Sequence, residues 1–117
     1  MNVRELLAQK DAFIGKEVTV EGLLVEKAPE RHLYLAPDEE NCDDVANSMR
    51  IDLPISRREL ETRLPCWVGT AYAHFDPATV TGVLQLSDDG IFPAVITSLS
   101  KFTTVQYDEI IDILSGD

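Results

Sequence analysis

Positive charge is scarce in the second half of this chain. Residues 64–117 contain one basic residue, Lys101, whereas residues 1–63 hold fourteen acids and nine bases. The formal net charge at pH 7 is −11. Non-specific binding to nucleic acid draws most of its affinity from Lys and Arg, so this deficit disfavours a polyanion as the partner.

Cysteines and long apolar runs are also few. In a chain long enough to build its own core we expect Cys42 and Cys66 to be free thiols rather than a disulfide framework, with Cys66 buried beside Trp67. No stretch approaches the roughly 18 apolar residues of a membrane-spanning helix, and the N-terminus lacks the apolar segment of a signal peptide. These absences predict a cytoplasmic protein.

The 117 residues are sufficient for one globular domain, because 44% are hydrophobic and 26% are charged, as in average folded domains. We expect one domain over residues 1–117. Its parts are an N-terminal helix in residues 1–14, a β-barrel in 15–102 and a C-terminal helix in 103–117.

Periodicity predicts a helix over about residues 3–13, capped by Asn2 with Glu5. "KEVTVEGLLVEK" is typical of a long strand with a bulge or bend at Gly22. Two shorter strands follow in "RHLYLAP" and "SMRIDLP", where apolar and polar residues alternate.

"ISRRELETRLP" predicts a short helix over residues 56–64, in which Ser56 is the N-cap and Glu59 completes a capping box. Beyond it, three β-rich runs are separated by the turn signals "DPA" and "DDG": "WVGTAYAHF", "TVTGVLQLS" and "FPAVITSLSKF". "YDEIIDIL" is interpreted as an amphipathic helix with a buried apolar stripe, packed on the barrel or across a dimer. The stripe consists of Tyr107, Ile110, Ile111 and Leu114.

This order resembles an OB-fold, a Greek-key barrel of five strands with a helix between the third and fourth. "GKEVTVEGLLVE", "LPCWVGTAYAHF" and "FPAVITSLSKF" are similar to the first, fourth and closing strands of the anticodon-binding group of OB-fold domains. The resemblance covers about residues 15–102 and implies a mainly β, five-to-six-stranded barrel. The chain departs from that group in an additional β run and in the missing basic residues.

OB-folds commonly bind single-stranded nucleic acid on the outer face of the second and third strands, by stacking bases on aromatic side chains. The strand phases place His32, Tyr34 and Arg50 on that face, and Arg31 beside them completes the candidate binding set. The structural alternative is that the two rings cover the barrel surface and that Arg50 pairs with a neighbouring carboxylate.

"PDEENCDD" is a candidate acidic interaction loop between the second and third strands. Its carboxylates are Asp38, Glu39, Glu40, Asp43 and Asp44. The calcium-loop pattern fails, because Cys42, Asp43 and Met49 stand where an oxygen ligand, a glycine and a glutamate are needed. The cysteines and histidines do not form a zinc motif, so we predict no metal and no cofactor. The loop is a solvated connection or an acidic epitope that steers a basic partner.

The chain has no nucleophile elbow, no phosphate-binding glycine motif and no paired metal-ligand motif, so we predict that it is not an enzyme. Two hypotheses remain. The first is an acidic OB-fold module that binds a protein with a basic surface, or that self-associates through its C-terminal helix; an adaptor, an inhibitor or immunity-type protein and an assembly subunit all fit. The second is a binder of single-stranded nucleic acid.

Overall fold

A computed structural model describes residues 1–27, 32–64 and 72–114, so the predictions for Arg31, Cys66 and Trp67 lie outside the described residues. The strands are β1 (Glu17–Lys27), β2 (Leu33–Ala36), β3 (Met49–Ile51), β4 (Tyr72–Leu86), β5 (Ala94–Gln106) and β6 (Glu109–Asp112). The helices are α1 (Val3–Ala8), α2 (Lys10–Phe13), the 3-10 turn η1 (Val45–Asn47) and α3 (Arg57–Arg63).

Five of these strands close into a barrel. β1 pairs with β2 and β4, β2 pairs with β3, and β4 pairs with β5, all antiparallel, while a parallel β3–β5 pairing completes the closure. β6 is an extra strand on the outer edge of β5. The protein is therefore mainly β, with a closed five-stranded barrel that is compatible with an OB-fold and with the predicted fold class at that level.

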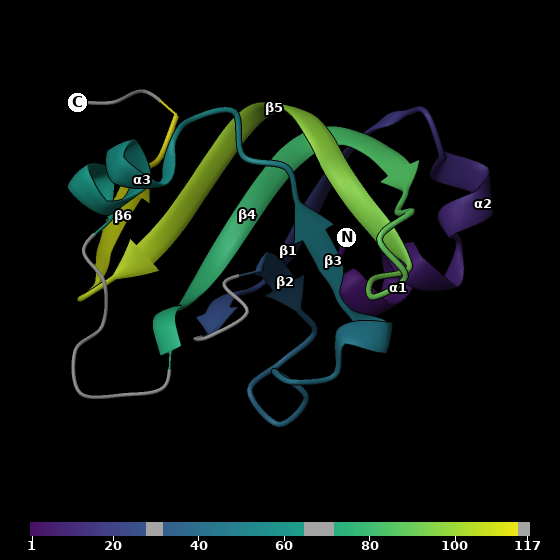
Figure 1. Cartoon of the computed structure of the whole chain (residues 1–117), viewed down its shortest axis with the longest axis horizontal. Coiled ribbons are helices and arrows are strands. Elements are labelled where there is room, and N and C mark those ends of the chain that lie inside the picture. Colours follow the sequence, from purple (N-terminus) through teal and green to yellow (C-terminus); the bar gives the residue numbers. More distant parts are fainter. Residues whose placement is uncertain (28–31, 65–71, 115–117) are drawn as a thin grey trace.

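The main hydrophobic core fills the barrel. Alternate residues of β1 point inward, among them Val18, Val20 and Leu24, and meet the fully buried Phe102 of β5. Leu6 of α1 and Leu60 of α3 belong to the same cluster. α3 lies at the opposite end of the barrel from α1 and α2 (Figure 1), so short helices cover both ends of the core.

The cap at Asn2 forms as predicted, but the single helix predicted over residues 3–13 is divided at Gln9 into α1 and α2. Asn2 Oδ1 accepts a hydrogen bond from Glu5 N at 2.8 Å, and Asn2 N donates to Glu5 Oε1 at 3.2 Å. A Cβ at Gly22 would lie 2.8 Å from Val3 Cγ2 and 2.9 Å from Ala36 O. The β1–β4 register continues unbroken through Gly22, so of the predicted bulge or bend the bulge is absent and the bend stays a prediction. The glycine lets α1 and β2 approach β1 closely.

A turn predicted at "DPA" is also wrong, because β4 runs without interruption from residue 72 to 86. The strand tolerates Pro77 because the described β4–β5 pairs begin one residue later, at Ala78↔Thr104. Because Pro77 lies just beyond that ladder, its missing N–H removes no hydrogen bond to β5. The predicted runs "WVGTAYAHF" and "TVTGVLQLS" therefore contribute to one strand.

The predicted C-terminal helix is wrong. Residues 107 and 108 form a tight turn in which both φ angles are positive, 52° and 63°, and the chain returns as β6 along β5. Ile113 is buried and Ile111 is half-buried, whereas Ile110 faces solvent, as expected for a strand. The four stripe residues are thereby divided: Tyr107 and Ile110 are each 77% exposed, and Ile111 and Leu114 pack on the core.

Ser56 caps α3 as predicted, accepting a hydrogen bond from Glu59 N at 3.1 Å. Ser56→Ala should lower the free energy of unfolding by about 1 kcal/mol, the usual cost of losing a capping oxygen. Urea titration measures it. Ser100→Ala, at an exposed position of β5, is the control and should change nothing. Equal unfolding midpoints for the two variants would show that the cap contributes no stability.

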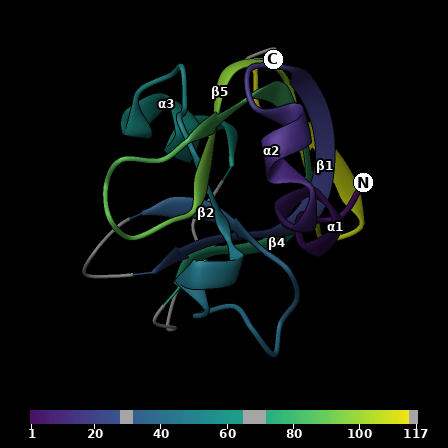
Figure 2. The ribbon, with the colours of Figure 1, turned by 90° about the vertical axis from the view of Figure 1, so that its right-hand side faces the viewer.

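The loop between β2 and β3 projects from the barrel when the molecule is viewed from the α2 end (Figure 2). Within the described ranges, no helix has the length and apolar character needed to cross a membrane.

Candidate functional site on the outer face of β2 and β3

The outer face of β1 and β2 carries a second hydrophobic cluster. Leu23 and Val25 of β1 and Tyr34 of β2 alternate with the residues that face the barrel interior, yet all three are buried. Cys42 from the β2–β3 loop and Phe92 from the β4–β5 loop cover them. The face on which an OB-fold would bind nucleic acid is thus covered by the chain itself.

Tyr34 is the centre of this covered face and is only 5% exposed. Its hydroxyl donates a hydrogen bond to Cys42 O at 2.6 Å, and its ring lies 5.2 Å from the ring of Phe92 at a tilt of 44°. His32 meets the same phenyl ring edge-on at 5.6 Å. The predicted aromatic pair is brought together, but it packs against Phe92 rather than offering a stacking surface.

Arg50 shares the outer face with Tyr34, as the strand phases predict, and lies opposite it in the β2–β3 register. Its Nε is 3.0 Å from Asp89 Oδ2, and its side chain is 31% exposed. The guanidinium therefore pairs with a carboxylate of the chain, which is the structural alternative that the sequence left open. Arg31, the fourth residue of the predicted set, lies outside the described residues.

Asp89 anchors the β4–β5 loop through one carboxylate. Its Oδ1 accepts hydrogen bonds from Ile91 N at 2.8 Å and Phe92 N at 3.0 Å, while Oδ2 meets Arg50. The N–H groups of Ile91 and Phe92, with the nearby Arg50 guanidinium, hold the pKa of the Asp89 carboxyl below its usual range. The turn residue that the sequence indicated thus positions Phe92 over Tyr34.

Asp89→Ala should lower the free energy of unfolding by about 1 kcal/mol at pH 7, a modest value because the carboxylate touches solvent. A carboxyl whose pKa is lowered by folding stabilises the protein above its unfolded pKa of about 3.9, and this contribution is lost as the pH falls through the folded pKa. The difference between Asp89→Ala and wild type should therefore shrink below about pH 4. Urea titrations from pH 7 to 2.5 measure it.

Asp88→Ala, one position earlier, is the matched control and should leave stability unchanged at every pH. A difference between wild type and Asp89→Ala that stayed constant from pH 7 to 2.5 would contradict the proposed role of the ionised carboxylate.

The acidic loop is held by its own polar groups. Asp38 Oδ1 accepts hydrogen bonds from Asn41 Nδ2 at 2.8 Å and Asn41 N at 2.9 Å, and Asp38 Oδ2 lies 2.7 Å from Arg4 Nη1. These partners, Asn41 first, hold the pKa of Asp38 below its usual range. Glu39, Glu40 and Asp43 are exposed, so three of the five predicted carboxylates face solvent.

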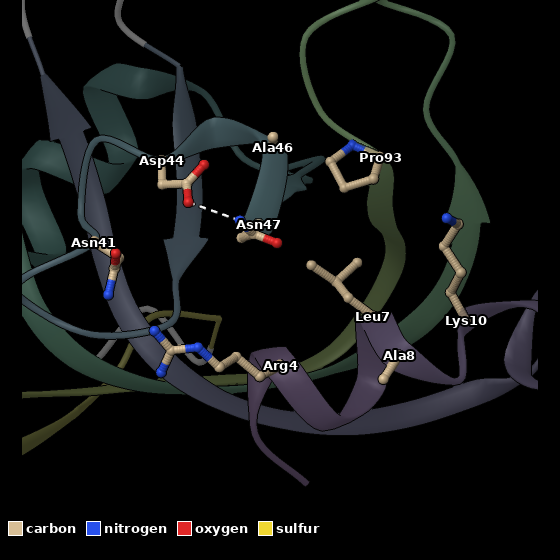
Figure 3. Close-up of a pocket in the computed structure, with 9 residues that line it drawn as sticks. All are labelled: Arg4, Leu7, Ala8, Lys10, Asn41, Asp44, Ala46, Asn47 and Pro93. Atoms are coloured by element: carbon tan, nitrogen blue, oxygen red, sulfur yellow. Dashed lines mark hydrogen bonds between the residues drawn. The ribbon is translucent and has the colours of Figure 1, made fainter.

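A hollow of about 420 Å³ separates this loop from the N-terminal helices (Figure 3). Leu7 points into it from α1, with Arg4 beside it, and Pro93 faces it from the position just before β5. Asp44 accepts a hydrogen bond from Asn47 Nδ2 at 2.7 Å on the opposite wall. The sequence does not reveal this hollow, because its walls come from three separate segments.

A buried polar group lies at one end of the barrel interior. Glu26 is 1% exposed and lies opposite His74, which is fully buried, and Asp76 is 3% exposed two residues further along β4. The inward alternation of β1 and β4 could have located these residues. Among the described residues, no group of three or more His, Cys, Asp or Glu side chains is placed to hold a metal ion.

Comparison with known proteins adds no relationship: no protein-family model matches the chain, and no curated protein matches it either. The resemblance to anticodon-binding domains therefore rests on strand pattern alone.

Proposed function

We propose that this chain is a non-catalytic, cytoplasmic OB-fold protein that binds another protein with a basic surface. The strand pairing β1–β2–β3–β5–β4–β1, with α3 between β3 and β4, supports the OB-fold assignment. An adaptor, an inhibitor and an assembly subunit all remain within this proposal.

The observation that carries the proposal is the covered outer face of β2 and β3. A single-strand binder needs exposed aromatics for stacking and unpaired cations for phosphates. Here Phe92 lies against Tyr34, and Asp89 pairs with Arg50. Nucleic acid would have to displace the β4–β5 loop from a hydrophobic cluster before it reached either residue.

The charge distribution supports the same conclusion. Residues 64–100, which include β4 and the start of β5, contain no Lys or Arg, and the exposed carboxylates of the acidic loop add negative potential beside the face. A concentrated field of one sign raises the rate of encounter with an oppositely charged partner. We therefore favour a basic protein over a polyanion.

The first test is direct. Fluorescence anisotropy with labelled single-stranded DNA and RNA, of mixed and homopolymer sequence, should give dissociation constants weaker than roughly 100 μM at physiological salt. Among the described residues of this face, Arg50 is already paired with Asp89, which leaves little positive charge to supply counterion release. Micromolar binding that is abolished by Tyr34→Ala and Arg50→Ala would replace the proposal with the nucleic-acid alternative.

The second test is affinity purification of the full chain from nuclease-treated native lysate. We expect a basic protein to co-elute at low salt and to be retained less by a variant with Glu39→Gln, Glu40→Gln and Asp43→Asn. Lys16→Gln, which changes a charge outside the loop, is the control and should retain it fully. Capture that is unaffected by salt and by the loop variant would contradict electrostatic steering.

A further inference from the structure

β6 is the terminal strand of the sheet in the described part of the chain. Its pairs with β5 run from Gln106↔Glu109 to Thr103↔Asp112, and it follows β5 at the end of the strand order. The parallel β3–β5 pairing closes the barrel without β6. In the described residues β6 therefore pairs with β5 along one edge, and its other edge pairs with no strand.

The hydrogen-bond alternation of an antiparallel pair shows which backbone groups face outward. Ile113 N donates to Phe102 O at 2.8 Å, so Ile113 turns its backbone toward β5. Since the pattern repeats every second residue in the unbroken β5–β6 register, Ile111 and Glu109 do the same. Ile110 consequently directs its N–H and C=O away from β5, where an added strand would bond.

Exposed apolar side chains accompany this edge. Ile110 and Tyr107 are each 77% exposed, and Val105, the partner of Ile110 in the register, is 40% exposed. A shallow hollow of about 170 Å³ lies on the other side of Val105, over β5, β4 and β1, and is not part of this edge. A strand added beside β6 would place one of its side chains against Ile110.

The acidic side chains around this edge indicate which kind of strand could bind there. Residues 103–114 contain Asp108, Glu109 and Asp112 and no Lys or Arg. Pairing with β6 of a second copy would bring six such carboxylates together between chains that each carry a net charge of −11. A segment with basic side chains would relieve that repulsion, so the edge resists self-pairing while remaining attractive to a basic strand.

We propose that β6 binds an extended, basic segment of another protein as an added antiparallel or parallel strand, with alternating Lys or Arg and apolar side chains. This inference rests on the proposed function and names the docking position of its basic partner. The backbone of Ile110 supplies the hydrogen bonds, and the exposed side chain of Ile110 supplies the apolar contact.

The probe is an eight-residue peptide of alternating lysine and valine, capped at both ends, added to the full chain. Amide exchange by NMR should show the Ile110 N–H slowed by about tenfold or more at saturation, as expected when a solvent-facing amide becomes hydrogen-bonded. A peptide of the same sequence, N-methylated on alternate backbone nitrogens, is the matched control and should bind at least about tenfold more weakly. Ile110→Pro removes the outward N–H without touching a β5 hydrogen bond, and should weaken binding similarly.

Equal binding of the methylated and unmethylated peptides would overturn the inference, because attraction would then be electrostatic only. Binding that leaves Ile110 exchange unchanged, or no binding at millimolar peptide, would overturn it as well. The peptide experiments test the docking position on β6 only. The proposed function is tested separately, by the capture of a basic protein from lysate, so either claim can fail without the other. If Ile110→Pro does not fold, the comparison of the methylated with the unmethylated peptide still tests whether backbone hydrogen bonds at β6 are needed for binding.

Discussion

Replacing Phe92 with alanine is expected to lower the free energy of unfolding by about 3 kcal/mol and to open the outer face of β2. Phe92 is 4% exposed and packs against Tyr34 and His32. Removing a buried phenyl ring forfeits its transfer free energy and leaves a cavity, for which 3–5 kcal/mol is usual. We expect the lower end because the site lies beneath a surface loop that can partly close over it.

A thiol-reactivity assay reports the opening independently of stability. Cys42 belongs to the same cluster and is 9% exposed, so its reaction with a disulfide reagent should accelerate by about tenfold or more in Phe92→Ala, measured in a Cys66→Ser background. The matched control is Ile91→Ala, because Ile91 is adjacent but 42% exposed. Unchanged Cys42 reactivity in the Phe92 variant would show that the β2–β3 loop covers the face without help from Phe92.

Among the described glycines, an added methyl group is expected to cost the most stability at Gly82 of β4. A Cβ there would lie 2.6 Å from Thr97 O, 2.7 Å from Ile96 Cγ2 and 2.9 Å from Leu99 Cδ2. Overpacking a tight core usually costs 1–3 kcal/mol, and contact with a backbone oxygen leaves little room to adjust. Gly82→Ala should therefore lower the free energy of unfolding by about 3 kcal/mol.

The close contacts at Gly82 arise from a bulge in the pairing of β4 with β5. The register shifts between Thr81↔Lys101 and Val83↔Thr97, so three residues of β5 stand opposite Gly82 alone. Ser98, within that bulge, has a φ of 50°. Such bulges bend a strand at a barrel corner. Urea titration beside Gln85→Ala, at an exposed β4 position, is the measurement. If Gly82→Ala lowered the free energy of unfolding by less than about 1 kcal/mol, the bulge in β5 would have to shift to accommodate the methyl group, and the expectation would be wrong.

Local pattern was sufficient for several elements of this protein. The alternation of Val18 and Val20 predicts β1, and the hydroxyl of Ser56 before "RRELE" predicts the start of α3. Both signals act within a few residues: side chains alternate along a strand, and a cap satisfies N–H groups one turn away. The phases of β2 and β3 are of the same kind, and they place Tyr34 and Arg50 on one face; the structure adds that the two residues stand opposite each other.

Contacts between distant segments decided the rest. "YDEIIDIL" has the spacing of a helix, but pairing with β5 makes it a strand and leaves Ile110 exposed. Tyr34 is on the predicted face, yet Phe92, 58 positions later in the numbering, covers it. Edge pairing and loop packing depend on which segments meet in space, and a periodicity within one segment carries no information about that meeting. The sequence therefore determined β1, β2 and β3 with their faces and the start of α3, whereas only the tertiary structure decided the continuity of β4 and which faces and edges remain open to a partner.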